Sequence, residues 1–220
     1  MITRRAAGIG AATSLAIAAI PKPSAAAAEA EAIELPAPSQ TGGKPLMEAL
    51  ALRRSIRAYA VKPLPLQLLS DLLWAANGIN RVAEGGRTAP YWRHIMVLDT
   101  YAAMADGVWL HDPTAHRLLR HLREDIRADT GLQDFVGGAP LNLIYVAHGE
   151  RMRDISPQER RFFASVDTGF IGQNVYLFCA SEGLATVFRG AVPYEKLEKT
   201  LRLPAEQFVT FAQTVGYSAT

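Results

Sequence analysis

The sequence predicts a mixed α+β domain or a three-layer α/β sandwich, and three observations lead to this prediction. Leucine and alanine recur at helical spacing after Pro45 and again after Pro65, and proline is favoured in the first turn of a helix. Short β-branched runs bounded by turn residues indicate buried strands. Residues 157–182 are apolar on most of a helical circumference, so this helix must be buried on several sides, in a core or a subunit interface.

The individual elements follow from periodicity and from turn residues. The expected helices cover residues 45–52, 66–77, 157–182 and 193–201. The expected strands cover residues 94–104, 108–111, 140–147, 184–188 and 208–215. Asp106-Gly107 predicts a tight hairpin turn between the first two strands, and Gly183 is expected to end the longest helix.

The first 28 residues have the layout of a signal peptide. Arg4 and Arg5 precede an uncharged stretch over residues 6–20, and three alanines at 26–28 offer a cleavage site. The uncharged stretch is too short to span a bilayer as a helix, and no cysteine follows it that could carry a lipid anchor. The arginine pair favours the twin-arginine route, with an ordinary Sec signal as the alternative. We therefore expect a periplasmic or otherwise exported protein with no membrane anchor.

The composition of the N-terminal residues also sets the expected domain boundaries. Residues 1–28 are the expected signal peptide, and residues 29–44, rich in alanine, proline, glutamate and glycine, are expected to be a flexible linker. Residues 45–220 form one expected domain.

Charge and cysteine content exclude several classes of function. The formal charge is +2, but without residues 1–28 the chain has 20 basic and 21 acidic residues, so no basic excess is available for a nucleic acid backbone. The single cysteine, Cys179, excludes an internal disulfide and lies in an apolar stretch, where a buried hydrophobe is expected. The five histidines show no close spacing, and we expect no metal site.

One short motif carries the strongest sign of ligand binding. Arg53, Arg54, Ser55 and Arg57 follow directly after the first helix and bring three guanidiniums and a hydroxyl together. Arginine binds phosphate oxygens in a bidentate manner, so an anion site is one interpretation. A solvated helix end is the other, because the C-terminus of a helix attracts cations in any case.

Several motifs, taken together and in order, resemble the nitroreductase-like flavoprotein family over roughly residues 44–220. The segment from Leu50 to Tyr59 resembles the family's opening motif. The later matches are Leu69 to Gly78, Gly86 to Pro90, Asp167 to Asn174, Ala180 to Thr186 and Val215 to Tyr217. The resemblance implies a nitroreductase-like three-layer α/β/α sandwich with a central buried dimer helix, here residues 157–182, and therefore a homodimer.

The resemblance also implies a cofactor, FMN, and residues that hold it. Arg53 and Ser55 match residues that bind the ribityl phosphate, with Arg54 in the same group. Arg57 matches a basic residue near the flavin pyrimidine edge, where a positive charge would stabilise the anionic reduced ring. A backbone N–H of Arg189 or Gly190 matches the group that points at the flavin N5.

The loop after Pro90 departs from the family pattern. A serine and an asparagine are usual there, and this chain has Tyr91 and His94 with Trp92 between them. We expect Pro90, Tyr91 and His94 to contact flavin or substrate, with simple packing of the aromatic residues as the alternative. No catalytic acid, base or nucleophile stands out, as expected of a flavoenzyme in which hydride enters and leaves at N5.

The predicted function is thus an FMN-dependent oxidoreductase that acts on a small organic substrate, with nitroaromatic or quinone acceptors and NAD(P)H as the expected donor. Because NAD(P)H is scarce outside the cytoplasm, another electron source is a second interpretation. The third is an exported FMN-binding carrier or docking module without turnover.

Overall fold

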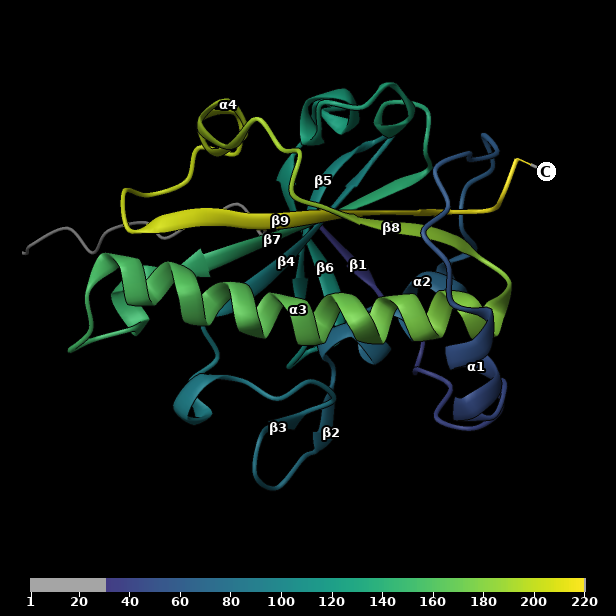
Figure 1. Cartoon of the computed structure of the whole chain (residues 1–220), viewed down its shortest axis with the longest axis horizontal. Coiled ribbons are helices and arrows are strands. Elements are labelled where there is room, and N and C mark those ends of the chain that lie inside the picture. Colours follow the sequence, from purple (N-terminus) through teal and green to yellow (C-terminus); the bar gives the residue numbers. More distant parts are fainter. Residues whose placement is uncertain (1–30, 220) are drawn as a thin grey trace, which may run out of the picture.

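The computed structural model describes residues 31–219 of the chain, and the expected signal peptide, residues 1–28, lies outside them. Within the described residues a seven-stranded antiparallel sheet has the order β1-β6-β5-β4-β7-β9-β8 (Figure 1). Its strands are β1 (Ala32–Glu34), β4 (Leu98–Met104), β5 (Gly107–Asp112), β6 (Arg117–Leu122), β7 (Leu141–His148), β8 (Ala185–Arg189) and β9 (Gln207–Gly216). A separate small hairpin pairs β2 (Ile79–Arg81) with β3 (Gly86–Arg87).

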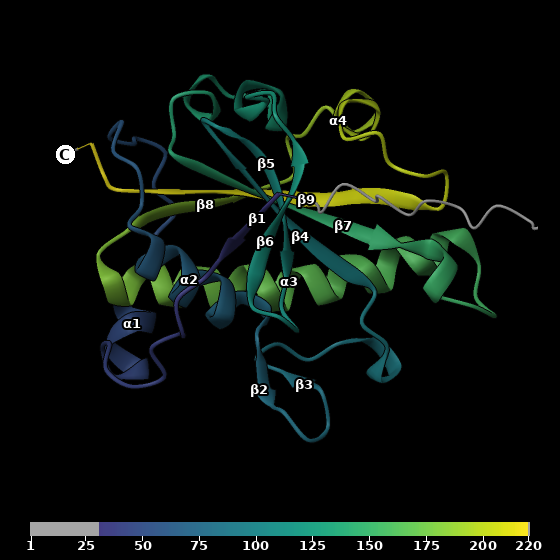
Figure 2. The same cartoon turned by 180° about the vertical axis from the view of Figure 1, so that it is seen from behind.

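Helices cover both faces of the sheet. One face carries α1 (Leu46–Leu52), α2 (Leu66–Asn77) and the long α3 (Pro157–Glu182). The other carries α4 (Tyr194–Thr200) and the short 3-10 helices η2 (Arg127–Thr130) and η3 (Asp134–Val136), as Figure 2 shows from behind. Every residue of β7 is buried, which requires cover on both sides. The predicted three-layer α+β sandwich is confirmed.

Two hydrophobic cores lie on the two faces of β7, as the alternation of side chains along a strand requires. Leu143 and Tyr145 belong to the core under α2 and α3, and Ile144 and Val146 belong to the core under α4. The sheet thus lies between two helical layers.

The long helix forms as the sequence predicts. Ser156 accepts a hydrogen bond from the Glu159 N–H, and the Glu159 carboxylate accepts one from the Ser156 N–H, so the first turn of α3 is capped from both sides. Gly183 ends the helix in the left-handed conformation, with φ 69°. One face of α3, including Ile171 and Val175, is buried against the sheet.

The prediction of a strand over residues 94–104 is wrong for its first four residues, 94–97. Trp92–His94 form the 3-10 helix η1, in which Arg93 and His94 have φ of 44° and 59°. This left-handed backbone cannot continue a strand, so β4 begins only at Leu98. The hairpin at Asp106-Gly107 is confirmed, with Gly107 at φ 131°.

The prediction of a flexible linker over residues 29–44 is wrong for residues 32–34. Ala32–Glu34 form β1, which pairs antiparallel with β6 at the edge of the sheet. Leu35, the next residue, is 8% exposed and belongs to the core, so the segment buries apolar side chains that the composition alone did not reveal. No helix among residues 31–219 is both long and apolar enough to cross a bilayer.

Candidate functional site

The arginine-rich segment leaves α1 and runs along the outer edge of β8. The Ile56 N–H donates to the Thr186 carbonyl at 3.0 Å, and the Ala60 N–H donates to the Tyr217 carbonyl at 2.9 Å. Because β8 is the last strand of the sheet, these bonds fix residues 56–60 at an edge that no other strand of residues 31–219 covers.

Tyr176 of α3 joins this segment to β8. Its hydroxyl lies 2.8 Å from the Ser55 hydroxyl and accepts a hydrogen bond from the Phe188 N–H at 2.9 Å. The Arg53 guanidinium lies over the Tyr176 ring, 5.2 Å from its centroid. Tyr176 was missed by sequence reasoning, although a tyrosine inside an otherwise apolar helix signals a hydroxyl that needs a partner.

The arginines of the segment differ in what they bind. The Arg54 guanidinium donates to the carbonyls of Ala51 and Arg53, at 2.8 Å and 2.7 Å, and so caps the end of α1. No carboxylate of residues 31–219 forms an ion pair with Arg53 or Arg57. Two cationic side chains and the Ser55 hydroxyl are therefore available to an anion at the edge of β8.

The Arg189 side chain points away from this group into the protein. Arg189 is 3% exposed and donates to the Thr130 carbonyl at 2.8 Å, to Thr214 Oγ1 at 3.0 Å and to Asn142 Oδ1 at 3.2 Å. Burial lowers the pKa of its guanidinium to about 10. The side chain is structural, and only the backbone at this position can face a ligand.

Of the two backbone amides expected near the flavin, that of Gly190 fits the open edge. The Phe188 N–H points outward to Tyr176. Successive backbone N–H groups along a strand point alternately to its two edges. The Arg189 N–H therefore faces β9, where Arg189 pairs with Ala212, and the next outward N–H is that of Gly190. A Cβ at Gly190 would lie 3.5 Å from Phe211, an ordinary contact, so bulk inside the protomer does not require glycine there.

The loop with Pro90, Tyr91 and His94 lies elsewhere on α3. The Trp92 N–H donates to the Asp167 carboxylate at 2.8 Å, and Tyr91 and His94 face each other with ring centroids 6.2 Å apart. Burial raises the pKa of Asp167. Asp167 and Tyr176 are nine residues apart, about 13 Å along a helix. One protomer therefore does not bring this loop to the arginine-rich segment.

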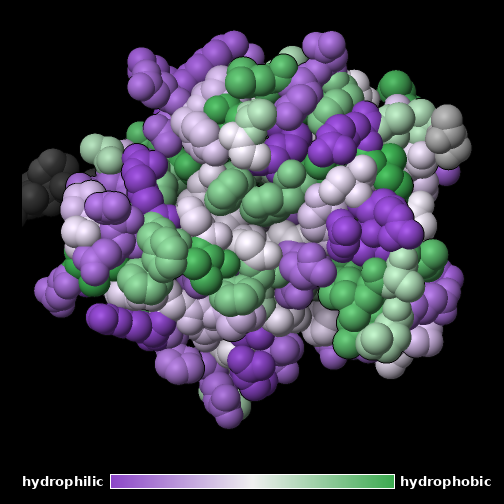
Figure 3. Space-filling view, viewed as in Figure 1, coloured by the Kyte–Doolittle hydropathy of each residue, from purple (hydrophilic) through white to green (hydrophobic). Residues whose placement is uncertain are grey.

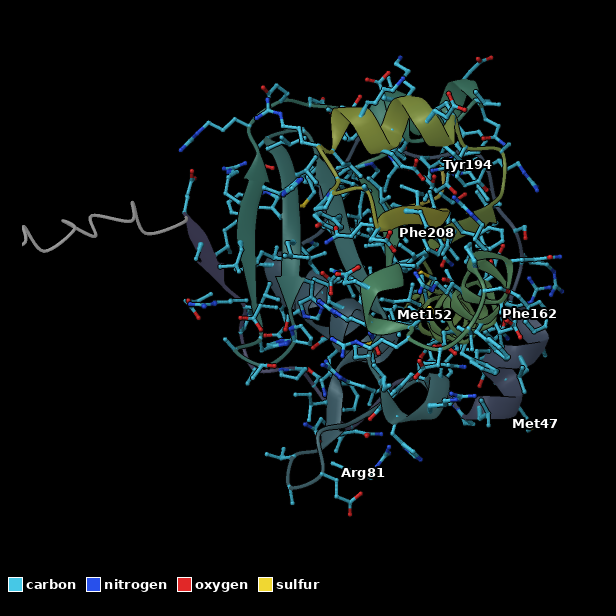
Figure 4. All side chains as sticks on the ribbon, turned by 90° about the vertical axis from the view of Figure 1, so that its left-hand side faces the viewer. Met47, Arg81, Met152, Phe162, Tyr194 and Phe208 are labelled. Atoms are coloured by element: carbon cyan, nitrogen blue, oxygen red, sulfur yellow. The ribbon has the colours of Figure 1, made fainter. Side chains whose placement is uncertain are left out.

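The outer face of α3 is apolar and open. Phe162, Val166 and Phe170 follow one another at helical spacing and are 62%, 39% and 43% exposed. On α1, Met47 is 74% exposed, and Figure 4 shows it on the same side of the molecule as Phe162. Hydrophobic side chains gather over both helices in Figure 3. We call the exposed large apolar residues of α1 and α3 the apolar face; they are Leu46, Met47, Leu50, Leu52, Phe162, Val166 and Phe170.

Comparisons with known proteins agree with this architecture. The nitroreductase family matches residues 50–217. A protein of Methanocaldococcus jannaschii assigned as a nitroreductase, MJ1384, is 32% identical over 168 residues, which are 72% of this chain and 84% of that relative.

Solved structures extend the likeness to the fold. A protein of Ralstonia eutropha JMP134 assigned as a nitroreductase is 43% identical and superposes with a TM-score of 0.82, over 86% of this chain and 90% of the other. The NADPH:FMN oxidoreductase of Vibrio harveyi, solved with NAD+, shares the fold at 21% identity and a TM-score of 0.57, over 80% of this chain and 69% of its own. The chain belongs to the nitroreductase family.

Proposed function

We propose that this protein is an FMN-dependent oxidoreductase that transfers hydride between a nicotinamide donor and a small organic acceptor of the nitroaromatic or quinone type. The observation that carries the proposal is the group of Arg53, Ser55 and Arg57 at the open edge of β8. Neither arginine forms an ion pair among the described residues, and the Gly190 amide follows along the same edge. When bound, FMN accepts a hydride at N5 and returns it to an acceptor.

The donor set at the edge of β8 fits a flavin mononucleotide. A phosphate dianion needs charge-assisted donors, and Arg53 and the Ser55 hydroxyl supply them without having to leave another anion. The Tyr176 hydroxyl already accepts from the Phe188 N–H, and when it donates its own proton to Ser55 Oγ the serine proton is free to point at an oxyanion. Arg57, further along the segment, would place a positive charge near the ring.

A homodimer is part of the same proposal. The apolar face on α1 and α3 groups more exposed hydrophobic side chains than the surface of a soluble monomer usually carries in one place. A second copy packed on this face would remove Phe162, Val166 and Phe170 from water. A two-fold arrangement would also allow the Pro90 to His94 loop of one protomer to approach the arginine-rich segment of its partner. Light scattering of the purified protein tests this, and a monomeric mass with flavin bound would contradict it.

The cofactor test is direct. The pure protein is denatured, and the released flavin is separated by chromatography and quantified against protein. We expect FMN at one per subunit. Recovery of FAD, or failure of the apoprotein to bind added FMN, would overturn the proposal.

Turnover is tested separately. Oxidation of NADH and NADPH is followed with a nitroaromatic compound or a quinone as acceptor. Steady turnover supports the oxidoreductase. Bound FMN that dithionite reduces, but neither nucleotide reduces, would contradict a nicotinamide donor. The electron donor would then be another class of reductant, or the protein would be a carrier without turnover.

We also propose that the protein is exported, on the basis of residues 1–28. Cell fractionation followed by N-terminal sequencing checks this. We expect the mature chain in the exported fraction, beginning near residue 29, and an intact N-terminus in the cytoplasm would contradict it.

A further inference from the structure

A pocket lined by aromatic rings lies beyond the end of β8, and we call it the aromatic pocket. β8 ends opposite Ala212, so within residues 31–219 the beginning of β9 has no neighbouring strand on that side. The pocket has a volume of about 220 Å³ and lies between α3, the beginning of β9 and the first residue of α4. Figure 4 faces this end of the molecule. The lining includes Arg161 and Ser165 of α3, Tyr194 of α4, and Phe208 and Phe211 of β9.

The aromatic pocket adjoins Gly190, whose amide the proposed function assigns to the flavin. The Tyr194 hydroxyl donates to the Gly190 carbonyl at 3.1 Å. A Cβ at Gly190 would lie 3.5 Å from the Phe211 ring. A hydride acceptor has to come within roughly 3–3.5 Å of the reacting atom. The aromatic pocket is therefore the space into which the rest of an acceptor can extend from that atom.

Among the described residues that line the pocket, Arg161 is the one with a charge. Its guanidinium lies over the Phe208 ring, 4.5 Å from the ring centroid. It forms no ion pair with a carboxylate of residues 31–219, whereas the neighbouring Arg160 is paired with Glu206 at 2.9 Å. The donors of Arg161 are thus available to an anion, and a carboxylate can accept two of them at once.

The size and the walls of the pocket favour a single aromatic ring. A cavity of about 150 Å³ admits benzene, so a pocket of about 220 Å³ holds one ring with a small substituent. Phe211 and Tyr194 are only partly buried and offer ring surface on which an aromatic ligand can pack. A ring with an acidic substituent satisfies both the aromatic walls and Arg161.

We propose that the aromatic pocket receives the electron acceptor, and that this acceptor is a single aromatic ring bearing a carboxylate. The inference rests on the proposed function, which supplies the reacting atom beside Gly190. The carboxylate pairs with the Arg161 guanidinium and the ring packs on Phe211, so Arg161 is a specificity residue. For a nitrobenzoate, the nicotinamide gives up one hydride and the medium supplies one proton. The nitro group gains these two electrons, becomes a nitroso group and loses one oxygen as water.

The binding test uses isothermal titration calorimetry on the full-length protein as purified, so it needs no turnover. Benzoate and benzamide form a matched pair of similar shape that differs by one negative charge. We expect saturable binding of benzoate at one per subunit, roughly 3- to 10-fold tighter than that of benzamide, as for a partly solvated ion pair. The difference should narrow as salt is added, because salt screens an exposed charge.

Turnover adds a second readout with para-nitrobenzoate and para-nitrobenzamide as acceptors for the same nicotinamide donor. We expect a KM roughly 3- to 10-fold lower for the nitrobenzoate and a similar kcat for both, because the ion pair forms on binding and not in the chemical step. No turnover with either acceptor would overturn the proposed function. The calorimetry with benzoate would still decide whether the aromatic pocket binds an anionic ring.

Three variants locate the preference. Arg161 is exposed, so Arg161→Met should fold like the wild type. It should weaken benzoate and raise the KM for para-nitrobenzoate roughly 3- to 10-fold, and leave both amides unchanged. Arg161→Lys keeps the charge and should retain part of the preference. Arg202→Met is the control, because it removes the same charge from an exposed position beyond the far end of α4. It should behave like the wild type.

Two results would overturn the inference. One is equal affinity of the wild type for benzoate and benzamide, and the other is a preference for benzoate that Arg161→Met leaves intact. If both nitro compounds were nevertheless reduced, the proposed function would stand without this specificity.

Discussion

Arginines in two neighbouring regions of this molecule have opposite surroundings. Arg53 and Arg57 lie at the open edge of β8, and no carboxylate of the described residues pairs with them. Arg189, on β8 itself, is 3% exposed, and its guanidinium donates to oxygens of Thr130, Asn142 and Thr214. The first two are available to a ligand, and the third connects η2, β7 and β9.

The difference shows that an arginine in a family motif becomes a ligand-binding or a structural residue according to its partners. Neutral oxygens satisfy the donors of Arg189, so nothing remains for a flavin except the backbone beside it. Arg53 lies over a tyrosine ring and forms no ion pair within residues 31–219, so an incoming phosphate displaces none there. The following substitutions test this contrast, from the largest expected effect to the smallest.

Arg189→Met should destabilise the fold strongly. The change removes the Arg189 donors to the buried Thr130 carbonyl and to Thr214 Oγ1, at roughly 1–3 kcal/mol for each acceptor left unpaired, while Asn142 Oδ1 keeps its hydrogen bond from Thr214. We expect a loss of about 2–5 kcal/mol in the free energy of unfolding, measured by urea denaturation at fixed protein concentration. Arg57→Met is the control and should stay within about 0.5 kcal/mol of the wild type. Equal stability of the two variants would remove the distinction.

Arg53→Ala should weaken the binding of FMN without unfolding the protein. Loss of a charge-assisted bond to a phosphate dianion is worth roughly 1.5–3 kcal/mol, or about 10- to 100-fold in Kd. Titration of the apoprotein by flavin fluorescence measures it, with Arg81→Ala on the distant β2–β3 hairpin as the control. If Arg53→Ala bound FMN as tightly as the wild type, the motif would be a solvated helix end.

The elements with a clear local pattern were predicted from the sequence, and the strands β1 and β6, which lack one, were not. The helix over residues 157–182 has a capping box, a terminal glycine and a long apolar pattern, and the structure reproduces its bounds. β6 was missed because Arg117–Leu122 combines leucines with two arginines and a histidine and shows no clean alternation. Its strand conformation comes from pairing with β5 and β1, which no local pattern encodes.

The site shows the same limit. The motif at Arg53 to Arg57 could be recognised locally, and Gly190 could be placed by its turn. Tyr176 connects the motif to β8, because its hydroxyl accepts from the N–H of Phe188, 12 residues later in the chain. This contact depends on how α3 packs against β8. The loop from Pro90 to His94 could be found as a departure from the family pattern, but its distance from the arginines is a property of the folded chain.

Tyr176→Phe tests the connection between the two sides of the site. The substitution removes the hydroxyl that holds Ser55 and accepts from the Phe188 N–H, and it keeps the ring beneath Arg53. A hydrogen bond is worth about 0.5–1.5 kcal/mol, so we expect FMN affinity to fall by roughly 3- to 10-fold. Tyr101→Phe is the control, because Tyr101 belongs to the core under α4, on the other face of the sheet. An equal loss of affinity in the control would contradict the role of the Tyr176 hydroxyl.

Arg57→Ala should have the smallest effect on affinity and a distinct effect on redox behaviour. Arg57 is exposed and without an ion pair in the described chain, so we expect FMN to bind less than about 10-fold more weakly than in the wild type. A positive charge near the ring stabilises the anionic reduced state, and its removal should lower the midpoint potential of the bound flavin. Equilibration with a reference dye measures the potential. Arg53→Ala, tested at saturating FMN, should shift the potential less than Arg57→Ala, because its charge is expected at the phosphate. The reverse order would exchange the roles proposed for the two arginines.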